Sequence, residues 1–325
     1  MELQRRVFDP PRQSFFLFGP RGTGKSTWLR HVSELDHFEF EAALTPGLLP
    51  LVVAADRPDD VLRAYASLYL HEEVRLEGWA RNVGVFARFL EAISFSHAAV
   101  LNVANVAREC QVERKTAAAY VEVLEDLLLS FRVPVFTRRA RRDTSTHPKF
   151  FLFDAGVFRS LRPKGPLDRP QEIAGAALEG LVAQHLRAWL AYRESDAELF
   201  FWRTRSGVEV DFIVYGAAGF WAIEVKNTDR VRQEDLRGLA AFGADYSQAE
   251  LVLLYRGTRR ERRGRTWILP VEDFLRTLHP ATTGRPRAAL GVPWAPRVSA
   301  GRRKGENGLE AAYPHTGLWR SWERA

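Results

Sequence analysis

A glycine-rich segment near the start of the chain carries the residue types that bind phosphate. Residues 19–26 read GPRGTGKS and follow the apolar run SFFLF of residues 14–18. They fit the G-x-x-x-x-G-K-[ST] pattern, between a predicted buried strand and a predicted helix. The glycines let the backbone approach an anion so that its N–H groups point inward, and the helix N-terminus adds positive charge. The segment therefore predicts a phosphate-binding loop, also called a Walker A motif or P-loop.

The polar residues of this loop have expected roles in nucleotide binding. Lys25 offers a mobile positive charge to the outer phosphates, and the hydroxyl of Ser26 can ligate the Mg²⁺ that accompanies them. The alternative is a glycine-rich turn without a ligand, which the flanking strand and helix disfavour. The predicted nucleotide-binding residues are Gly19, Gly22, Thr23, Gly24, Lys25, Ser26 and Thr27, with Ser26 also a metal ligand.

Acidic residues gather on two adjacent predicted strands in the second half of the chain. The strands cover residues 208–215 and 220–226, and the four-residue turn GAAG between them pairs Tyr215 with Phe220. The same register places Asp211 opposite Glu224. Strand alternation predicts a core face and a polar face. The core face holds Val208, Val210, Phe212, Val214, Trp221, Ile223 and Val225, and the polar face holds Glu209, Asp211, Glu224 and Lys226.

Such a polar face suits metal-assisted cleavage of a phosphodiester. Asp211 and Glu224 could hold Mg²⁺, and Lys226 could position a water or balance charge in the transition state. Glu179 lies at the edge of the apolar stripe of a predicted helix over residues 171–192 and could complete the shell. The alternative is a solvent-facing strand side with an ordinary Glu–Lys pair. Spacing alone leaves both open, because D-x(12)-E-x-K is a loose pattern.

Residues 98–154 have the order of a winged-helix module. Helices are predicted over residues 103–110 and 114–129, with a turn between them, and strands over 131–137 and 149–153. The loop between the strands begins RRARR at residues 138–142 and is expected to lie against DNA phosphates. Arg114, Lys115 and Thr116 would meet base edges. The alternative, a winged helix that packs against protein, is left equally open.

Composition limits the class of protein. The chain has 325 residues, enough for two or three domains, and 46% of them are hydrophobic and 27% charged, as in globular proteins. No apolar run is long enough to span a bilayer and no signal-peptide segment is seen, so we expect a cytoplasmic protein without a membrane partner. Cys110 is the single cysteine, which excludes an intramolecular disulfide. Most of the 47 basic residues are arginine, which suits nucleic acid, although genome composition could give the same bias.

The segment between the loop and the winged helix reads as mainly helical. Residues 48–56, LLPLVVAAD, have the shape of a strand that ends in an acidic residue, although Pro50 weakens that interpretation. Apolar residues then recur at three- and four-residue spacing from residue 57 onward, and a further helix is predicted over 83–93.

Several motifs together support a resemblance. They are GPRGTGKST (19–27), ALTPGLLP with LRAYASLYLHEEV, KFFLFDAGVF, GAALEGLVAQHL, FWRTRSGVEVDFIV and AIEVK. In these motifs the chain resembles prokaryotic P-loop ATPases of the AAA type that carry a C-terminal winged helix and a restriction-endonuclease-like domain of unknown function. The resemblance covers residues 14–280. It implies ATP and Mg²⁺ at the loop, and a D…E-x-K nuclease core at Asp211, Glu224 and Lys226.

The chain departs from this resemblance in its ATPase core. Members similar to it place a strand ending in Asp-Glu, and a later strand with a polar sensor, before the G-L-P segment. Here residues 31–43 lead directly to Gly47, and Asp56 falls after the core in that alignment. The ATPase core thus looks internally truncated, and without the acidic strand and the sensor we expect weak or absent hydrolysis. We also expect no stable ATPase fold, because one strand and one helix cannot bury both faces of a sheet.

The expected fold class is α/β. It comprises a truncated P-loop NTPase element (1–35), a helical segment (36–97), a winged helix (98–158), a PD-(D/E)xK endonuclease-like α/β domain (168–280) and a disordered tail (281–325). The leading hypothesis is an ATP-binding protein that engages DNA through its C-terminal domains. The alternatives are a magnesium-dependent DNA nuclease with a vestigial P-loop, and a non-enzymatic DNA- or partner-binding remnant. A homo-oligomer is left open.

Overall fold

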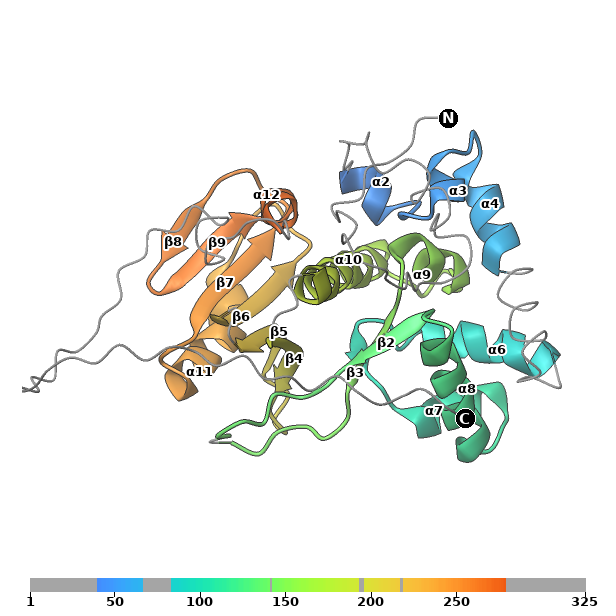
Figure 1. Ribbon diagram of the computed structural model, residues 1–325, viewed down its shortest axis with the longest axis horizontal. Helices are drawn as coiled ribbons and strands as arrows, with labels where there is room; N and C mark the ends of the chain where they lie inside the picture. The colour runs from blue at the N-terminus through green and yellow to red at the C-terminus, as the bar shows by residue number, and fades with distance from the viewer. Residues whose placement is uncertain (1–39, 67–82, 141, 193–195, 217–218, 279–325) are drawn as a thin grey trace, which may run out of the picture. The chain divides into compact units, whose positions relative to one another are not determined.

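The structure is a computed structural model that describes residues 40–66, 83–140, 142–192, 196–216 and 219–278 (Figure 1). The described residues all belong to one compact unit, residues 1–292. The predicted phosphate-binding loop at residues 19–27, the whole of segment 1–35 and the tail from residue 281 lie outside the described residues.

Short helices occupy the segment that precedes the small sheet. They are α2 (Phe40–Leu44), α3 (Pro50–Val53) and α4 (Pro58–Ala64), followed by the longer α6 (Val83–Ser94). The strand shape proposed for residues 48–56 is wrong, because Pro50 begins a helix there. Proline fits the first turn of a helix, where its missing N–H costs nothing.

A small three-stranded sheet follows α6. It contains β1 (Ala99–Val100), β2 (Ser130–Val133) and β3 (Lys149–Leu152), in the spatial order β1-β3-β2 with antiparallel pairing. Between β1 and β2 lie α7 (Val103–Cys110) and α8 (Arg114–Asp126), close to the predicted helices. Helix α8 ends earlier than predicted, and Leu128 has a left-handed φ of 59°.

The second half of the chain forms a six-stranded mixed sheet. After α9 (Ala155–Leu161) and the long α10 (Pro170–Tyr192) come β4 (Glu198–Arg203), β5 (Glu209–Gly216), β6 (Gly219–Lys226), η2 (Gln233–Leu236), α11 (Arg237–Asp245), β7 (Glu250–Tyr255), β8 (Glu261–Arg263), β9 (Thr266–Pro270) and α12 (Val271–Thr277). The spatial order is β4-β5-β6-β7-β9-β8, and β6, β7 and β9 run parallel. Mixed α/β architecture is therefore confirmed.

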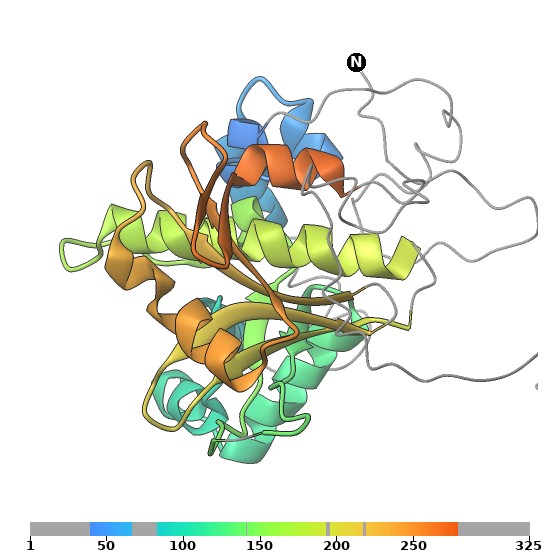
Figure 2. The same cartoon turned by 90° about the vertical axis from the view of Figure 1, so that its left-hand side faces the viewer.

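Two apolar clusters cover the two faces of this sheet. Leu178 and Leu181 of α10 pack in one cluster with Phe212 of β5, whereas Leu239 and Phe242 of α11 pack in the other. Figures 1 and 2 show α10 and α11 on opposite sides of the sheet. Because α10 also contacts β3 and α9, it joins the large sheet to the small one.

Candidate functional site

The hairpin that carries the candidate acidic residues has the predicted register. Tyr215 pairs with Phe220 and Phe212 with Ile223, in an antiparallel ladder. The turn is closed by Gly216 and Gly219, whose φ values of 151° and 138° are rarely adopted by residues with side chains. The composition of the turn thus set the pairing of β5 with β6.

A β-bulge in β5 changes which side chains share a face. Phe200 of β4 pairs with Ile213, but Trp202 pairs with Val210, so β5 contains one residue more than β4 between these pairs. The extra residue lies at Asp211-Phe212. As a result Val210 packs in the α11 cluster and Phe212 in the α10 cluster, which corrects the prediction that both lie on one core face. Bulges disrupt alternation locally and re-aim a side chain.

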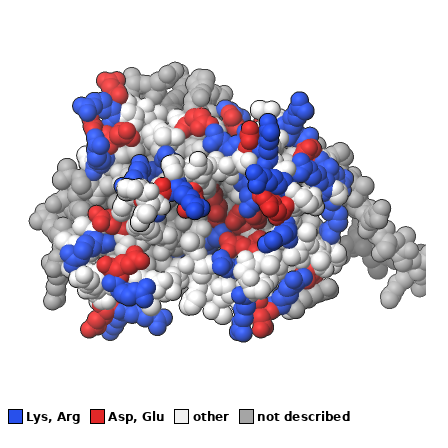
Figure 3. All heavy atoms as spheres, turned by 180° about the vertical axis from the view of Figure 1, so that it is seen from behind, with Lys and Arg blue, Asp and Glu red and all other residues white. Residues whose placement is uncertain are grey.

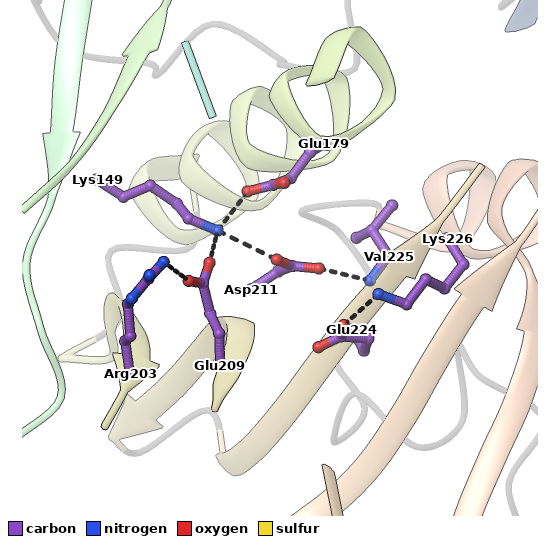
Figure 4. A network of polar contacts seen from close by, with 8 residues as sticks. All are labelled: Lys149, Glu179, Arg203, Glu209, Asp211, Glu224, Val225 and Lys226. Atoms are coloured by element: carbon purple, nitrogen blue, oxygen red, sulfur yellow. Dashed lines mark hydrogen bonds and ion pairs between the residues drawn. The ribbon is translucent and has the colours of Figure 1, made fainter. Parts of the chain in front are cut away.

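The bulge brings Asp211 to a buried lysine that the sequence did not single out as a site residue. Lys149 begins β3, and its side chain is 1% exposed. Its Nζ lies 2.7 Å from Glu179 Oε1, 2.5 Å from Glu209 Oε1 and 3.1 Å from Asp211 Oδ1. Figure 4 shows the three carboxylates turned toward this ammonium. We call Lys149, Glu179, Glu209 and Asp211 the lysine cage.

Charges in the lysine cage are nearly balanced by side chains. Arg203 Nη1 lies 2.7 Å from Glu209 Oε2 and supplies a second positive charge. Burial opposes the charge on Lys149, but the surrounding carboxylates outweigh it and raise its pKa well above the ordinary value. Burial and the neighbouring Asp211 raise the pKa of Glu179 well above its ordinary value. Two cations, Lys149 and Arg203, thus face the three carboxylates.

Glu224 and Lys226 form a separate pair at the end of β6. Lys226 Nζ donates to Glu224 Oε1 at 2.7 Å, and among the described residues Glu224 Oε2 is buried without a hydrogen-bond partner. Burial, with the nearby charge of Asp211, raises the pKa of Glu224 to about 8. Asp211 Oδ2 instead accepts the Val225 N–H at 2.9 Å. The predicted site residues are therefore divided: Glu179 and Asp211 join the lysine cage, whereas Glu224 and Lys226 pair with each other.

The residues do not fit a magnesium centre in this arrangement. Magnesium needs near-octahedral oxygen ligands at about 2.0–2.1 Å, but both oxygens of Asp211 already contact donors, one of them the Lys149 ammonium. A divalent cation at Asp211 would lie beside that positive charge and be repelled by it. Across the described ranges, no group of three or more His, Cys, Asp or Glu side chains is arranged to hold a metal ion.

One sequence signal could have identified Lys149. It is the only charged residue in the apolar run KFFLF, and a charge inside an apolar strand requires a partner. The partners themselves lie 30 and 62 positions away, at Glu179 and Asp211, so their identity did not follow from the local pattern.

The arginine-rich loop between β2 and β3 packs against the large sheet. Phe136 N donates to Phe201 O at 2.7 Å, and the Phe136 side chain is 1% exposed. Arg138 pairs with Glu198 at 2.8 Å, and Arg142 pairs with Asp245 at 2.7 Å. Arg141 lies outside the described residues. The loop therefore packs against the large sheet through Phe136, and its contact with DNA phosphates stays a prediction.

Two segments of the chain match protein families whose function is not known. Residues 37–168 match a domain of unknown function, DUF8612, and residues 174–274 match a second domain of unknown function, DUF4143. No curated protein matches the chain. Within the described residues, no helix is both long and apolar enough to cross a membrane. The lysine cage joins the two matched segments, since Lys149 lies in the first and its three carboxylates in the second.

Proposed function

We propose that this chain is an ATP-binding protein, with weak or absent hydrolysis, that binds DNA through its C-terminal parts without cutting it. The proposal that the protein does not cleave DNA rests on the position of the Lys149 ammonium among the three carboxylates of the lysine cage. The nuclease hypothesis needs a metal ion at Asp211, but the Lys149 ammonium already contacts that carboxylate, and each carboxylate of the lysine cage has a cationic partner without a metal.

The nucleotide part of the proposal rests on the sequence of residues 19–27. Lys25 would contact the outer phosphates of ATP, and Ser26 would ligate the accompanying Mg²⁺. Binding of a fluorescent ATP analogue by the intact chain, and its loss in Lys25→Ala, is the expected result. The matched control is Lys164→Ala, an exposed lysine far along the sequence. If wild type does not bind the analogue, or if Lys25→Ala binds it equally well, the nucleotide part fails.

The DNA part is supported by the order of elements around the small sheet. The succession α6, β1, α7, α8, β2, β3, with the sheet order β1-β3-β2, is that expected for a winged helix. Arg114 and Lys115 are exposed at the N-terminal end of α8, the end that meets DNA in helix-turn-helix proteins. A duplex mobility shift that weakens in Arg114→Glu/Lys115→Glu is expected. A shift equal to that of wild type would remove α8 from the proposal.

Incubation of plasmid DNA with the protein and Mg²⁺ or Mn²⁺ tests the absence of cutting. We expect no cleavage by wild type. Cleavage that is lost in Asp211→Ala but retained in Asp229→Ala, a control at an exposed aspartate, would replace this proposal with the nuclease alternative. The unpartnered Glu224 Oε2 is the specific observation that favours that second candidate, because a buried carboxylate oxygen without a donor can accept a cation.

A further inference from the structure

The edge of the large sheet carries a dense group of arginines that the proposed site does not use. Residues 256–265 read RGTRRERRGR, six arginines with one acidic residue. They form the loop after β7, the edge strand β8 and the turn into β9. The side chains from residue 258 to residue 265 are exposed. Figure 3, the view from behind, shows Lys and Arg side chains gathered at the right, on the side where β8 and β9 lie.

Some of these arginines are needed for the local structure. Arg265 donates to the carbonyl oxygens of Gly243 at 3.1 Å and Ala249 at 3.1 Å, at the end of α11. Arg263 donates to Val231 O at 2.9 Å and pairs with Glu261 at 2.7 Å. These contacts hold the antiparallel hairpin of β8 and β9 against the rest of the domain, so the backbone that carries its arginines has a fixed position.

Two arginines of the hairpin have a positive charge that no carboxylate offsets within the described residues. Among the described residues, Arg259 makes hydrogen bonds through its backbone alone: its N–H donates to Tyr255 Oη at 3.1 Å, and its carbonyl oxygen accepts from that hydroxyl at 2.7 Å. Arg262 lies over the ring of Trp267, with its guanidinium carbon 5.1 Å from the ring centroid. Arg260 is paired with Asp273 at 3.0 Å, but that pair is about half exposed and exposed pairs hold their partners weakly.

The hairpin starts beside the candidate site. Tyr255, at the end of β7, is the register partner of Lys226, at the end of β6. Arg256 N donates to Thr228 O at 2.8 Å, which joins the loop after β7 to the loop after β6. A long polymer that lay on the hairpin would therefore pass the same edge of the sheet as Glu224 and Lys226. A small anion would gain nothing from this alignment.

We propose that the exposed arginines Arg259, Arg260, Arg262 and Arg263, here called the hairpin patch, are a docking surface for the sugar–phosphate backbone of duplex DNA. Residues 259–263 span at most about 14 Å, over which one DNA strand presents about four phosphates. Arg262 and Arg263 are successive residues of β8 and point to opposite faces of the strand, so one DNA backbone contacts only part of the patch. Arginine grips phosphate with two N–H donors, which lysine cannot do. The inference rests on the proposed DNA binding and adds a second contact surface to that of α8.

Charge on an edge strand also has a simpler use. Charged side chains on an edge keep it from pairing with the edge of another molecule. That use would be served by either sign of charge and by either basic residue, whereas docking of DNA requires positive charge. Replacing arginine by glutamate keeps a charged side chain on the edge but reverses its sign, so this change distinguishes edge protection from DNA docking.

The test is fluorescence anisotropy of a labelled DNA duplex with the intact protein over a range of salt concentrations. The variant Arg259→Glu/Arg262→Glu is chosen because neither residue loses an ion pair. The control Arg57→Glu/Arg63→Glu makes the same change in net charge at side chains that are 81% and 70% exposed on α4 and its N-cap. Arg259→Lys/Arg262→Lys keeps the charge, and circular dichroism verifies that all variants are folded.

We expect the reversal to weaken binding to all duplex sequences alike, and to reduce the slope of log K against log salt by about two, one for each lost phosphate contact. The lysine variant should keep most of the slope, and the α4 control should keep all of it. If wild type binds DNA and Arg259→Glu/Arg262→Glu matches it, the hairpin patch is refuted while DNA binding stands. If wild type does not bind DNA, the proposed DNA function fails as well.

Discussion

Replacing Lys149 by methionine tests whether the lysine cage holds the two matched segments together. Methionine keeps an unbranched side chain of similar reach and removes the ammonium. Glu179 and Asp211 then lose their cation, although Glu209 keeps Arg203 at 2.7 Å. Removing one partner of a buried ion pair costs about 3–5 kcal/mol, against a total stability of about 5–15 kcal/mol for a typical protein. We therefore expect a folded but clearly destabilised protein.

The loss should depend on pH with a definite sign. Burial and Asp211 raise the pKa of Glu179, whereas Lys149 lowers it; without the ammonium, Glu179 therefore holds its proton to a still higher pH in the folded state than in the unfolded state. A group whose pKa is raised by folding contributes stability that is present below its unfolded pKa and disappears as pH rises through its folded pKa. Lys149→Met should therefore be least stable, relative to wild type, near pH 8 and should recover part of the difference near pH 5.

Urea unfolding of the intact chain at pH 5 and pH 8, followed by circular dichroism, measures both effects. Lys164→Met, at an exposed lysine, is the matched control and should change little. Adding Glu179→Gln to Lys149→Met should restore stability at pH 8, because the glutamine carries no charge. Equal stability of Lys149→Met and Lys164→Met at pH 8 would refute the reasoning, and so would a loss that is the same at both pH values.

Two further predictions follow from buried titratable groups. Burial raises the pKa of Glu224 to about 8, so the unfolding free energy of wild type should fall by about 1.4 kcal/mol per pH unit between about pH 5 and 8 relative to Glu224→Gln. The surface control Glu172→Gln should keep the wild-type slope. If the unfolding free energies of Glu224→Gln and wild type change with pH in parallel, the raised pKa of Glu224 is contradicted. Burial lowers the pKa of His97 to about 3, and its Nδ1 accepts the Leu152 N–H at 3.0 Å. Because His97 takes up a proton in the unfolded chain before it does so in the folded one, wild type should lose stability as pH falls below about 6.5. His97→Asn keeps an acceptor for that N–H and should lack this acid slope in the same urea series, so an unchanged slope would count against a neutral buried His97.

Several elements could be predicted because their signals are local. The turn at residues 216–219 set the register of β5 with β6, and the apolar spacing of residues 171–192 predicted α10. Helices α7 and α8 follow from their periodicity and the turn between them. In each case a few consecutive residues contain the hydrogen-bonding and packing preferences that decide the outcome. The phosphate-binding loop at residues 19–27 is predicted on the same local basis and remains a prediction.

The composition of the candidate site was predicted only in part. Strand alternation placed Asp211 and Glu224 together, but alternation holds only while two strands stay in step. The bulge opposite Phe201 depends on how β4 pairs with β5, and nothing in the sequence of β5 alone announces it. It directs Asp211 to Lys149 and leaves Glu224 with Lys226.

The amino-acid sequence alone was enough to establish an α/β chain, its helix-turn-helix order, a hairpin with acidic residues and a set of carboxylates in need of partners. Folding in three dimensions was needed to choose those partners. Lys149 comes from the small sheet, Glu179 from α10 and Asp211 from the large sheet, and they meet because α10 packs against both sheets. The physical reason is range: backbone preferences act over a few residues, whereas a buried charge is stabilised by whichever opposite charges packing brings within hydrogen-bond distance.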